Sequence, residues 1–333
     1  MPIRYIPVVR TKAGEADALG NLTAAARART FPLIRLTGQI PVTFQKKMIA
    51  NCNGFPMAID GSYNFLGTGG PAAYNGLFKG LGANGVPVIP VLWIRGDPAY
   101  NSAALALVGL YGHGFVLNVP LADLPLALGW VTAVEGWNPN NIDLLIDVGG
   151  VAEHDPAAMA PYVSHTINAT LKPGHPWRSV AVHSWSAPKD HGPLKAGRND
   201  VPRRDWRMWD QARLAVPFDI DYSDCGHVHP SLDEVPGFVM GNATVSVRYA
   251  VDNNWIIYKG SPVSGPNGID MGAQYRGHAK ALMADVAFGG VAGCWGDGRI
   301  QHYANGPGGT GGRAQWAALL LNRHLSLTAA RLP

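Results

Sequence analysis

The feature that most constrains this sequence is a series of eight short apolar segments between residues 5 and 226. Each has the length of a strand, is rich in valine and isoleucine, and is bounded by glycine, proline or polar residues. Their hydrophobicity is nearly continuous, which is typical of parallel strands buried on both faces. The segments are 5–10, 31–36, 56–61, 86–95, 114–120, 142–150, 178–186 and 218–226.

Segments with helical features lie between these predicted strands. Residues 14–29 place apolar side chains at helical spacing, and residues 155–171 begin with aspartate at the expected N-cap and proline in the first turn. Strands that recur every roughly 25–35 residues indicate repeated βα units. Eight units predict a (β/α)8 barrel of the TIM type. An open doubly wound sheet is the alternative, but no G-x-G-x-x-G follows the first segment.

The pattern changes in the last third of the chain. Residues 243–260 alternate in polarity around an Asp-Asn-Asn turn, which predicts a β-hairpin, and two helical segments follow at 273–286 and 312–327. We therefore expect a barrel over residues 1–230, with the hairpin and helices of residues 231–333 packed on it. Asp297, flanked by two glycines, is expected in a tight turn.

Composition limits the functional classes. The chain is 47% hydrophobic and only 15% charged, which indicates a well-buried globular protein. A net charge of +4 without a dense run of Lys or Arg permits an anionic ligand or nucleotide and disfavours nucleic acid. Three widely spaced cysteines, no secretory signal and no bilayer-length apolar run favour a cytoplasmic protein without a membrane segment.

In barrels of this type the active site lies at the carboxyl ends of the strands. Nearly every predicted strand here ends in a side chain that can ionise or donate hydrogen bonds. Arginines that converge on one rim are suited to a phosphate or carboxylate. The alternative is that Arg10, Arg35 and Arg95 form structural ion pairs with Glu15, Asp60 and Asp97. The residues predicted to bind substrate are Arg10, Lys12, Arg35 and Arg95, together with Arg248 and Lys259 from the hairpin.

Three aspartates at strand ends are the predicted metal ligands. Asp60, Asp147 and Asp224 follow apolar strand bodies, and carboxylate oxygens of this kind suit Mg²⁺ or Mn²⁺. The alternative is that they cap the helices that follow. His183 is the predicted general base or acid, because its ordinary pKa lies near neutrality, although a satisfied core histidine is the alternative. The predicted catalytic residues are thus His183, Asp147 and Asp224.

Residues 219–231, DIDYSDCGHVHPS, contain a His-x-His pair. Alternation places Asp221 and Ser223 on one face of the strand and Asp224 on the other. Because His227 and His229 follow a glycine, we expect them outside the strand, where the two-residue period no longer aligns them. A zinc site at this pair is therefore disfavoured.

The chain resembles the bacterial and phage-encoded group known as the beta family protein. The motifs that carry this resemblance span the whole chain and are YIPVVRTKAGEADALGNL, FPLIRL, IDYSDCG, RYAVDNNWIIYKG, CWGDGRI and QWAALLLNRHL. Arg10 stands where the group would have lysine, and only one histidine, His324, lies in the last motif. The resemblance implies a phage-associated or antiviral-defence context and little about chemistry.

We expect a hydrolase that acts on a phosphate-containing or other anionic ligand at the mouth of the barrel, assisted by a divalent metal. The alternative is a ligand- or partner-binding component of a defence or phage-associated system without catalytic activity. Both predict a polar mouth, and only turnover of the ligand separates them.

Overall fold

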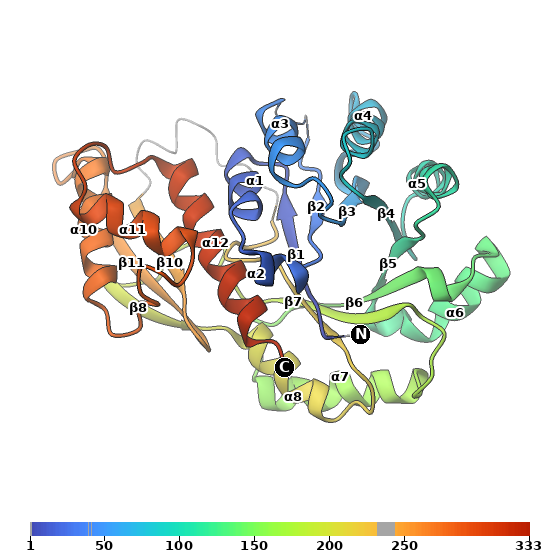
Figure 1. Ribbon diagram of the computed structural model, residues 1–333. Helices are drawn as coiled ribbons and strands as arrows, with labels where there is room; N and C mark the ends of the chain where they lie inside the picture. Colours follow the sequence, from blue (N-terminus) through green and yellow to red (C-terminus); the bar gives the residue numbers. More distant parts are fainter. Residues whose placement is uncertain (1, 39, 41, 232–243) are drawn as a thin grey trace.

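The computed structural model describes residues 2–38, 40, 42–231 and 244–333, which form a closed parallel barrel beside a smaller antiparallel sheet (Figure 1). Each barrel strand pairs with the next one in sequence, and the last pairs with the first, with Tyr5 opposite Tyr222. The strands are β1 (Tyr5–Arg10), β2 (Leu33–Arg35), β3 (Met57–Asp60), β4 (Val88–Trp93), β5 (Phe115–Pro120), β6 (Ile142–Gly150), β7 (Ser179–Trp185) and β9 (Asp221–Asp224). The eight-stranded barrel predicted from the sequence is confirmed.

Helical segments follow the barrel strands and cover the outside of the sheet (Figure 1). After β1 to β4 these are α1 (Ala13–Gly20), α2 (Ala24–Ala28), α3 (Val42–Asn51), η1 (Ser62–Asn64), α4 (Gly70–Gly82) and α5 (Pro98–Tyr111). After β5 to β7 they are η2 (Leu121–Leu126), α6 (Ala127–Gly129), η3 (Trp130–Glu135), η4 (Pro139–Asn141), α7 (Pro156–Thr170) and α8 (Arg204–Leu214).

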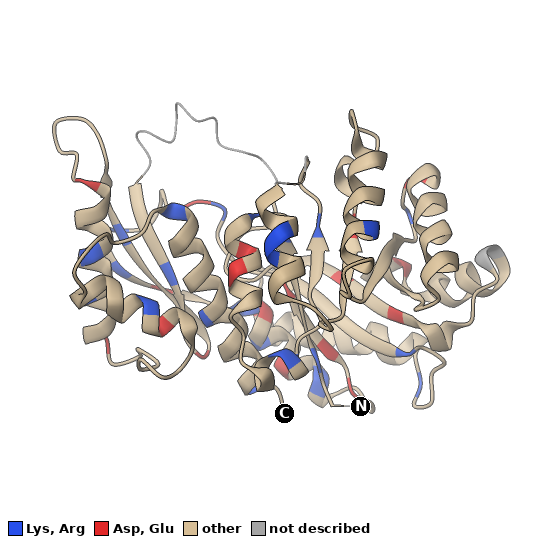
Figure 2. Cartoon of the chain, turned by 45° about the horizontal axis from the view of Figure 1, so that its top comes forward, with Lys and Arg blue, Asp and Glu red and all other residues tan. Residues whose placement is uncertain are grey.

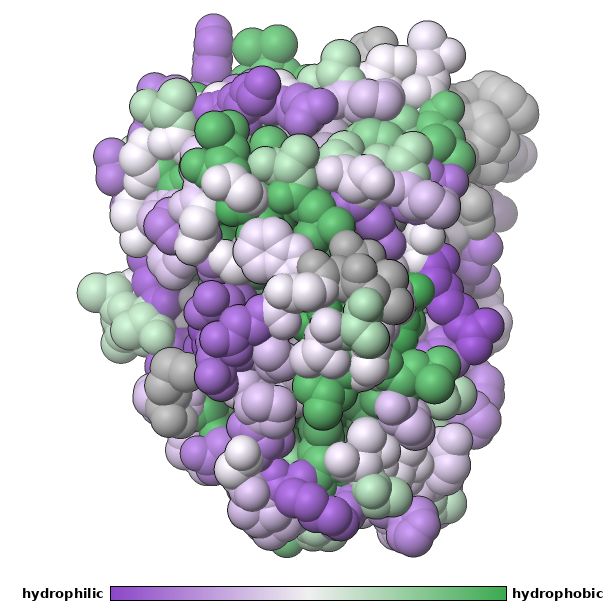
Figure 3. Space-filling model, turned by 90° about the vertical axis from the view of Figure 1, so that its right-hand side faces the viewer, coloured by the Kyte–Doolittle hydropathy of each residue, from purple (hydrophilic) through white to green (hydrophobic). Residues whose placement is uncertain are grey.

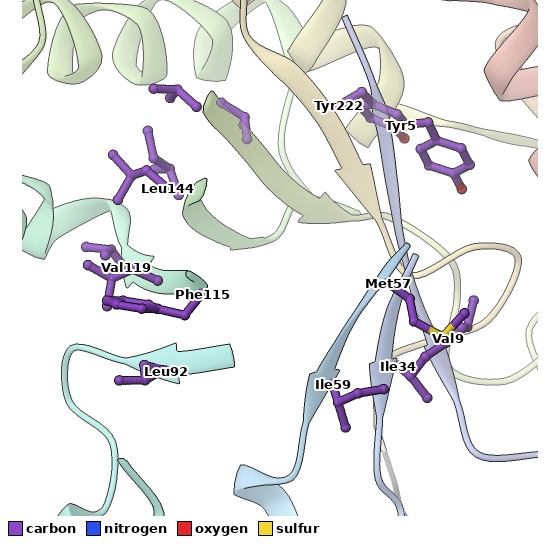
Figure 4. Packing of buried hydrophobic residues seen from close by; sticks show 14 of the residues in the cluster. Tyr5, Val9, Ile34, Met57, Ile59, Leu92, Phe115, Val119, Leu144 and Tyr222 are labelled. Atoms are coloured by element: carbon purple, nitrogen blue, oxygen red, sulfur yellow. The ribbon is translucent and has the colours of Figure 1, made fainter. Parts of the chain in front are cut away.

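Side chains alternate between the inside and the outside of the barrel wall. Ile6, Val91 and Leu145 belong to a cluster that contains alternate residues of the barrel strands and fills the interior. The intervening residues, such as Ile34 and Leu92, belong to the larger cluster beneath the helices, part of which Figure 4 shows. Because the side-chain period of a strand is two, this assignment fixes the direction of each polar residue further along the same strand.

The smaller sheet has the strand order β10-β11-β8. β10 (Thr244–Ala250) and β11 (Asn254–Pro262) are antiparallel, with Ala250 opposite Trp255, which confirms the predicted hairpin. The third strand, β8 (Gly197–Pro202), comes from the connection between β7 and α8 and pairs antiparallel with β11. α10 (Met271–Ala284) and α11 (Trp295–Asn305) pack on this sheet, and the sheet and helices together form what we term the lobe.

The last helix, α12 (Arg313–Arg331), joins the lobe to the barrel (Figure 1). It packs against α1 and β1 on one side and against α11 and β10 on the other. A Cβ at Gly14 would lie 2.7 Å from the carbonyl oxygen of Ala314, so the glycine permits the close approach of α1 and α12. α12 therefore occupies the place of the eighth barrel helix, and β8, from the connection after β7, joins the smaller sheet beside the hairpin.

The tight turn predicted around Asp297 is wrong, because this residue lies in the first turn of α11. Its carboxylate accepts hydrogen bonds from Tyr249 Oη (2.9 Å) and Arg323 Nη1 (3.0 Å), and it is completely buried. A Cβ at Gly296 would lie 2.2 Å from the carbonyl oxygen of Leu319. Gly296, beside Asp297, thus permits the close contact between α11 and α12 and does not form a turn.

The described surface on the side of α5 and α6 mixes apolar and polar residues. Figure 3 shows hydrophobic residues there in small groups between hydrophilic ones. The exposed hydrophobic residues of this region include Leu110 on α5, Leu126 at the end of η2 and Leu128 on α6. Isolated exposed leucines are common on protein surfaces, so this side carries no functional assignment.

Candidate functional site

Polar side chains continue the inward-facing series of the barrel strands at their carboxyl ends. Each follows, two residues later, an apolar residue that fills the interior. Five of these residues, which we term the mouth cluster, are Arg35 on β2, Asp60 on β3, Asn118 on β5, Asp147 on β6 and His183 on β7. This edge of a parallel barrel is where such folds place their active sites.

Asp60 is completely buried and its carboxylate is well supplied with hydrogen-bond donors. Arg35 Nε lies 3.2 Å from one carboxylate oxygen, and the backbone N–H of Ser62 donates to the other over 3.0 Å. The indole N–H of Trp93 also donates to Asp60, over 3.3 Å, and Arg35 stacks on the same indole. Asp60 is therefore already paired with a cation, Arg35. This is the structural ion pair considered as the alternative for Arg35.

His183 lies beside Asp147, its register partner on the neighbouring strand. Ser223 Oγ donates its proton to the carbonyl oxygen of Ile6 (2.7 Å), so at 2.9 Å it must accept from Nδ1 of His183. Nε2 of His183 then carries a lone pair. Burial lowers the pKa of His183, although the charge of Asp147 opposes this shift. The imidazole is thus neutral near pH 7 and can accept a proton at Nε2.

Cys225 Sγ lies 3.8 Å from Nε2 of His183, but the geometry does not make it a nucleophile. The thiol is buried in the barrel interior, and burial raises its pKa well above the ordinary value. A neutral thiol is a poor nucleophile. Cys225 is therefore a small packed residue.

Asn118 is the one member of the mouth cluster whose side chain has no hydrogen-bond partner among the described residues. Only 1% of its surface is exposed, yet neither Oδ1 nor Nδ2 is satisfied. A buried unsatisfied amide costs about 1–3 kcal/mol. Such a cost is commonly found at sites that bind water or a ligand.

Asp224 lies on the opposite side of the barrel wall from the mouth cluster, because it directly follows the inward-facing Ser223 and successive side chains of a strand point to opposite faces. It is completely buried beneath α12 and accepts hydrogen bonds from Tyr5 Oη (2.6 Å), Tyr222 Oη (2.9 Å) and His324 Nε2 (2.8 Å). Burial would raise the pKa of Asp224, but His324, Arg203 and the hydrogen bond from Tyr5 hold it below its usual range.

The structure therefore does not bring together the three predicted metal ligands. Asp60 and Asp147 face the barrel interior, whereas Asp224 faces the helices. Within residues 2–38, 40, 42–231 and 244–333, no three His, Cys, Asp or Glu side chains are grouped closely enough to hold a metal ion. Nor does Asp224 share the mouth with His183 and Asp147, the other two predicted catalytic residues.

Two predicted substrate-binding arginines form ion pairs at the rim of the barrel. Arg10 Nε lies 3.0 Å from a carboxylate oxygen of Glu15, and Arg95 makes a two-point contact with Asp123. The partner of Arg95 is thus Asp123 and not Asp97, whose carboxylate caps α5. Lys12 is exposed at the N-cap of α1. Arg10 continues the inward-facing series of β1, two residues after Val8.

A cleft of about 440 Å³ lies between the carboxyl ends of β7 and β9 and the lobe. We term it the basic cleft, because its described lining includes five basic or imidazole side chains and no acidic one. These five are Lys189, His191, His227, Arg248 and Arg313, and Tyr275 and Trp316 add aromatic surface. Basic positions also recur on the strands of the neighbouring sheet (Figure 2). The cleft is electrostatically suited to an anion.

Arg248 on β10 is the most unusual residue of this cleft. It is only 7% exposed, and no described carboxylate contacts it. Its guanidinium donates instead to the carbonyl oxygens of His227 and Pro188 and to Nε2 of His191. Burial lowers the pKa of Arg248 to about 10, so the group remains charged at pH 7. A buried charge of this kind is normally paired.

The histidines of the basic cleft are held neutral. Burial and the charge of Arg248 lower the pKa of His191 to about 4. The same two causes lower the pKa of His227 well below its ordinary value, with further contributions from His324 and Arg10. Nδ1 of His227 is buried without a hydrogen-bond partner among the described residues. The cleft thus concentrates positive charge and unused hydrogen-bonding capacity.

Of the residues of this cleft, the sequence predicted only Arg248. Lys259, the other predicted hairpin residue, donates to the carbonyl oxygens of Gly192 and Leu194 (both 2.7 Å) and so holds the loop that carries His191. Lys189 and His191 directly follow the seventh predicted strand, where the rule for barrel active sites could have found them. No local signal connects Arg313 to this site.

Comparison with known proteins adds a family to this description. No helix among the described residues is long and apolar enough to cross a membrane. No curated protein matches the chain. The model of a family described as "Beta protein" matches residues 5–329, which include every barrel strand and most of α12. On this nearly complete match, the chain belongs to the Beta protein family.

Proposed function

We propose that this protein binds a small phosphate-containing ligand at the carboxyl face of the barrel and hydrolyses it. The observation that carries the proposal is the buried charge of Arg248, which faces no described carboxylate and lines the basic cleft. A forked guanidinium with free donor capacity is the group that proteins use to hold phosphate oxygens. In this proposal the cleft holds the anion.

The mouth cluster supplies the acid–base chemistry of the proposed reaction. His183 is oriented by Ser223 so that Nε2 can accept a proton from the attacking water. Asp147, half-buried beside it, stabilises the imidazolium that forms. Asn118 offers both a donor and an acceptor to the uncharged part of the ligand. The predicted metal ligands do not come together among the described residues, so no step of the proposal runs through Mg²⁺ or Mn²⁺.

Binding is tested by calorimetry with inorganic phosphate and the four nucleoside 5′-monophosphates. We expect Arg248→Gln to weaken phosphate binding at least tenfold. The control is Arg198→Gln on β8 of the same sheet, because Arg198 is exposed and paired with Asp285 over 2.6 Å. Equal binding by wild type and Arg248→Gln would refute the proposed anion site.

Turnover is tested by release of inorganic phosphate from the same nucleotides, with EDTA, Mg²⁺ or Mn²⁺ present. His183→Gln and Asp147→Asn should each lower kcat by a factor of about 10² or more while leaving phosphate affinity unchanged. Ligand recovered chemically intact from the wild type under all three conditions would instead favour the second candidate, a binding protein of a defence or phage-associated system. The basic cleft would serve that function equally.

A further inference from the structure

The hydrogen bond between Arg248 and His191 fixes the protonation state of the imidazole. Nη2 of Arg248 lies 2.7 Å from Nε2 of His191. A guanidinium can only donate, so Nε2 must accept and the imidazole proton must be on Nδ1. His191 is therefore neutral in the structure described, although it is surrounded by cations.

The charges around His191 come from several elements. Arg248 faces it from β10 and Lys259 acts on it from β11, while Lys189 and Asp190 directly precede it in its own loop. Across the cleft the lining includes His227 and Arg313. Asp190 alone among these favours protonation of His191. An anion in the cleft would reverse this balance, because it would offset the field of the surrounding cations.

We propose that the basic cleft takes a terminal phosphate group in its doubly negative form, and that His191 takes up a proton from solvent when this group binds. Protonation at Nε2 releases Nη2 of Arg248, so that both groups can donate to the anion. One proton is gained for each anion bound, and no covalent bond changes. The inference rests on the proposed function and adds the charge state of its ligand.

The preference for a terminal phosphate follows from charge matching. A phosphate monoester carries two negative charges above its second pKa of about 6, whereas a diester carries one. At the buried end of the cleft Arg248 is the one cation among the described lining residues, because Lys189 is exposed and Arg313 is only half-buried. Arg248 therefore matches the single charge of a diester, and a diester does not favour protonation of His191. A dianion leaves a second charge unmatched at the buried end of the cleft, and a protonated His191 would match it. His191 is thus the proposed specificity-determining residue.

Sulfate is the first probe, because it stays doubly negative from pH 5.5 to 8 and any pH dependence then belongs to the protein. Calorimetry in buffers of different ionisation enthalpy should show uptake of up to one proton per sulfate. Affinity for sulfate should rise by up to tenfold for each pH unit as the pH falls from 8 to 6. Dimethyl phosphate, with one charge, should bind more weakly and without proton uptake.

His191→Gln is the decisive variant, because its amide oxygen can still accept from Arg248 but cannot be protonated. It should bind sulfate with an affinity that no longer depends on pH, whereas His302→Gln, outside the cleft, should behave like the wild type. His191→Asn is the second variant if His191→Gln fails to fold, as judged by circular dichroism.

The outcomes separate the inference from the proposed function. Sulfate binding by the wild type without proton uptake would overturn the role of His191 and leave the anion site intact. Proton uptake that survives in His191→Gln but is lost in His227→Gln would also overturn the assignment to His191. Failure of the wild type to bind either sulfate or phosphate would overturn the proposed function as well.

Discussion

His324 on α12 donates a hydrogen bond to Asp224 on β9 over 2.8 Å, and both side chains are completely buried. β10, β11, α10 and α11 lie between the two residues in the sequence. Arg203 lies 3.6 Å from the same carboxylate, and Tyr5 and Tyr222 donate to it. This network attaches the last helix to the last barrel strand, which accounts for the position of α12 as the eighth helix of the barrel.

Asp224→Asn should therefore destabilise the fold. Removal of one partner from a buried charged network costs about 3–5 kcal/mol, because the remaining cation is left unpaired. Denaturation with guanidinium chloride measures the change in the free energy of unfolding. Asp252→Asn is the control, because 78% of the Asp252 side chain is exposed, and it should cost less than about 0.5 kcal/mol. Similar losses in the two variants would contradict the structural role of the network.

Asn118→Leu should stabilise the protein and impair its function. The variant removes a buried amide with no partner among the described residues, so we expect a gain of about 1 kcal/mol or more in urea unfolding. Asn101→Leu is the matched control, because Asn101 pairs with both backbone groups of Trp93, and it should destabilise. If Asn118→Leu lowered stability and left nucleotide binding unchanged, Asn118 would be structural.

Stability should fall as the pH is lowered from 7.5 to 5.5. Burial lowers the pKa values of His183, His191 and His227 in the folded protein, whereas an unfolded histidine has a pKa of about 6.5. The unfolded state thus binds more protons in this window, and the free energy of unfolding rises with pH. Urea unfolding midpoints measured at intervals of about 0.5 pH units give the slope of stability against pH.

This pH dependence should weaken in the triple variant in which the three histidines are replaced by glutamine. Sulfate should also weaken it, because a bound anion favours protonation of the cleft. The window lies above the range in which ordinary carboxylates titrate, so their contribution is small. A midpoint that does not change between pH 7.5 and 5.5 would show that these histidines are not held neutral by the fold.

Gly296→Ala should separate α11 from α12. The added Cβ would lie 2.2 Å from the carbonyl oxygen of Leu319, which is backbone and cannot move aside cheaply. Gly277→Ala on α10 is the control, because the Cβ would meet nothing within 4 Å, and alanine should stabilise that helix by up to about 1 kcal/mol. Thermal unfolding of both variants tests the contrast, and equal effects of the two substitutions would exclude the close helix contact.

The barrel was predictable because its information is local. Each buried parallel strand is a continuous apolar run, such as the one that ends at Asp147, and each run before the last is followed by helical segments that pack on the sheet. The polar strand ends were visible for the same reason. Arg35, Asp60, Asp147 and His183 do meet at the mouth, since inward-facing positions recur every second residue along a strand.

Alternation alone could not assign the faces of the last strand. It separated Asp224 from Ser223 but did not say which of them faced the interior. Burial under α12 decides this, because Tyr5, Tyr222 and His324 give Asp224 its partners outside the barrel wall. The helix in place of a turn at Asp297 has a similar origin, since it depends on contacts with α12 and on Arg323.

The sequence by itself thus determined the barrel, the hairpin and the ring of polar strand ends, because patterns of a few residues control strands, helices and their faces. Only the tertiary structure decided the basic cleft. Its walls come from the loop after β7, the end of β9, the lobe and α12, and no short pattern relates His191 to Arg248 or Arg313. Their proximity follows from the packing of α12 and β8 across both parts of the molecule, which is a property of the whole chain.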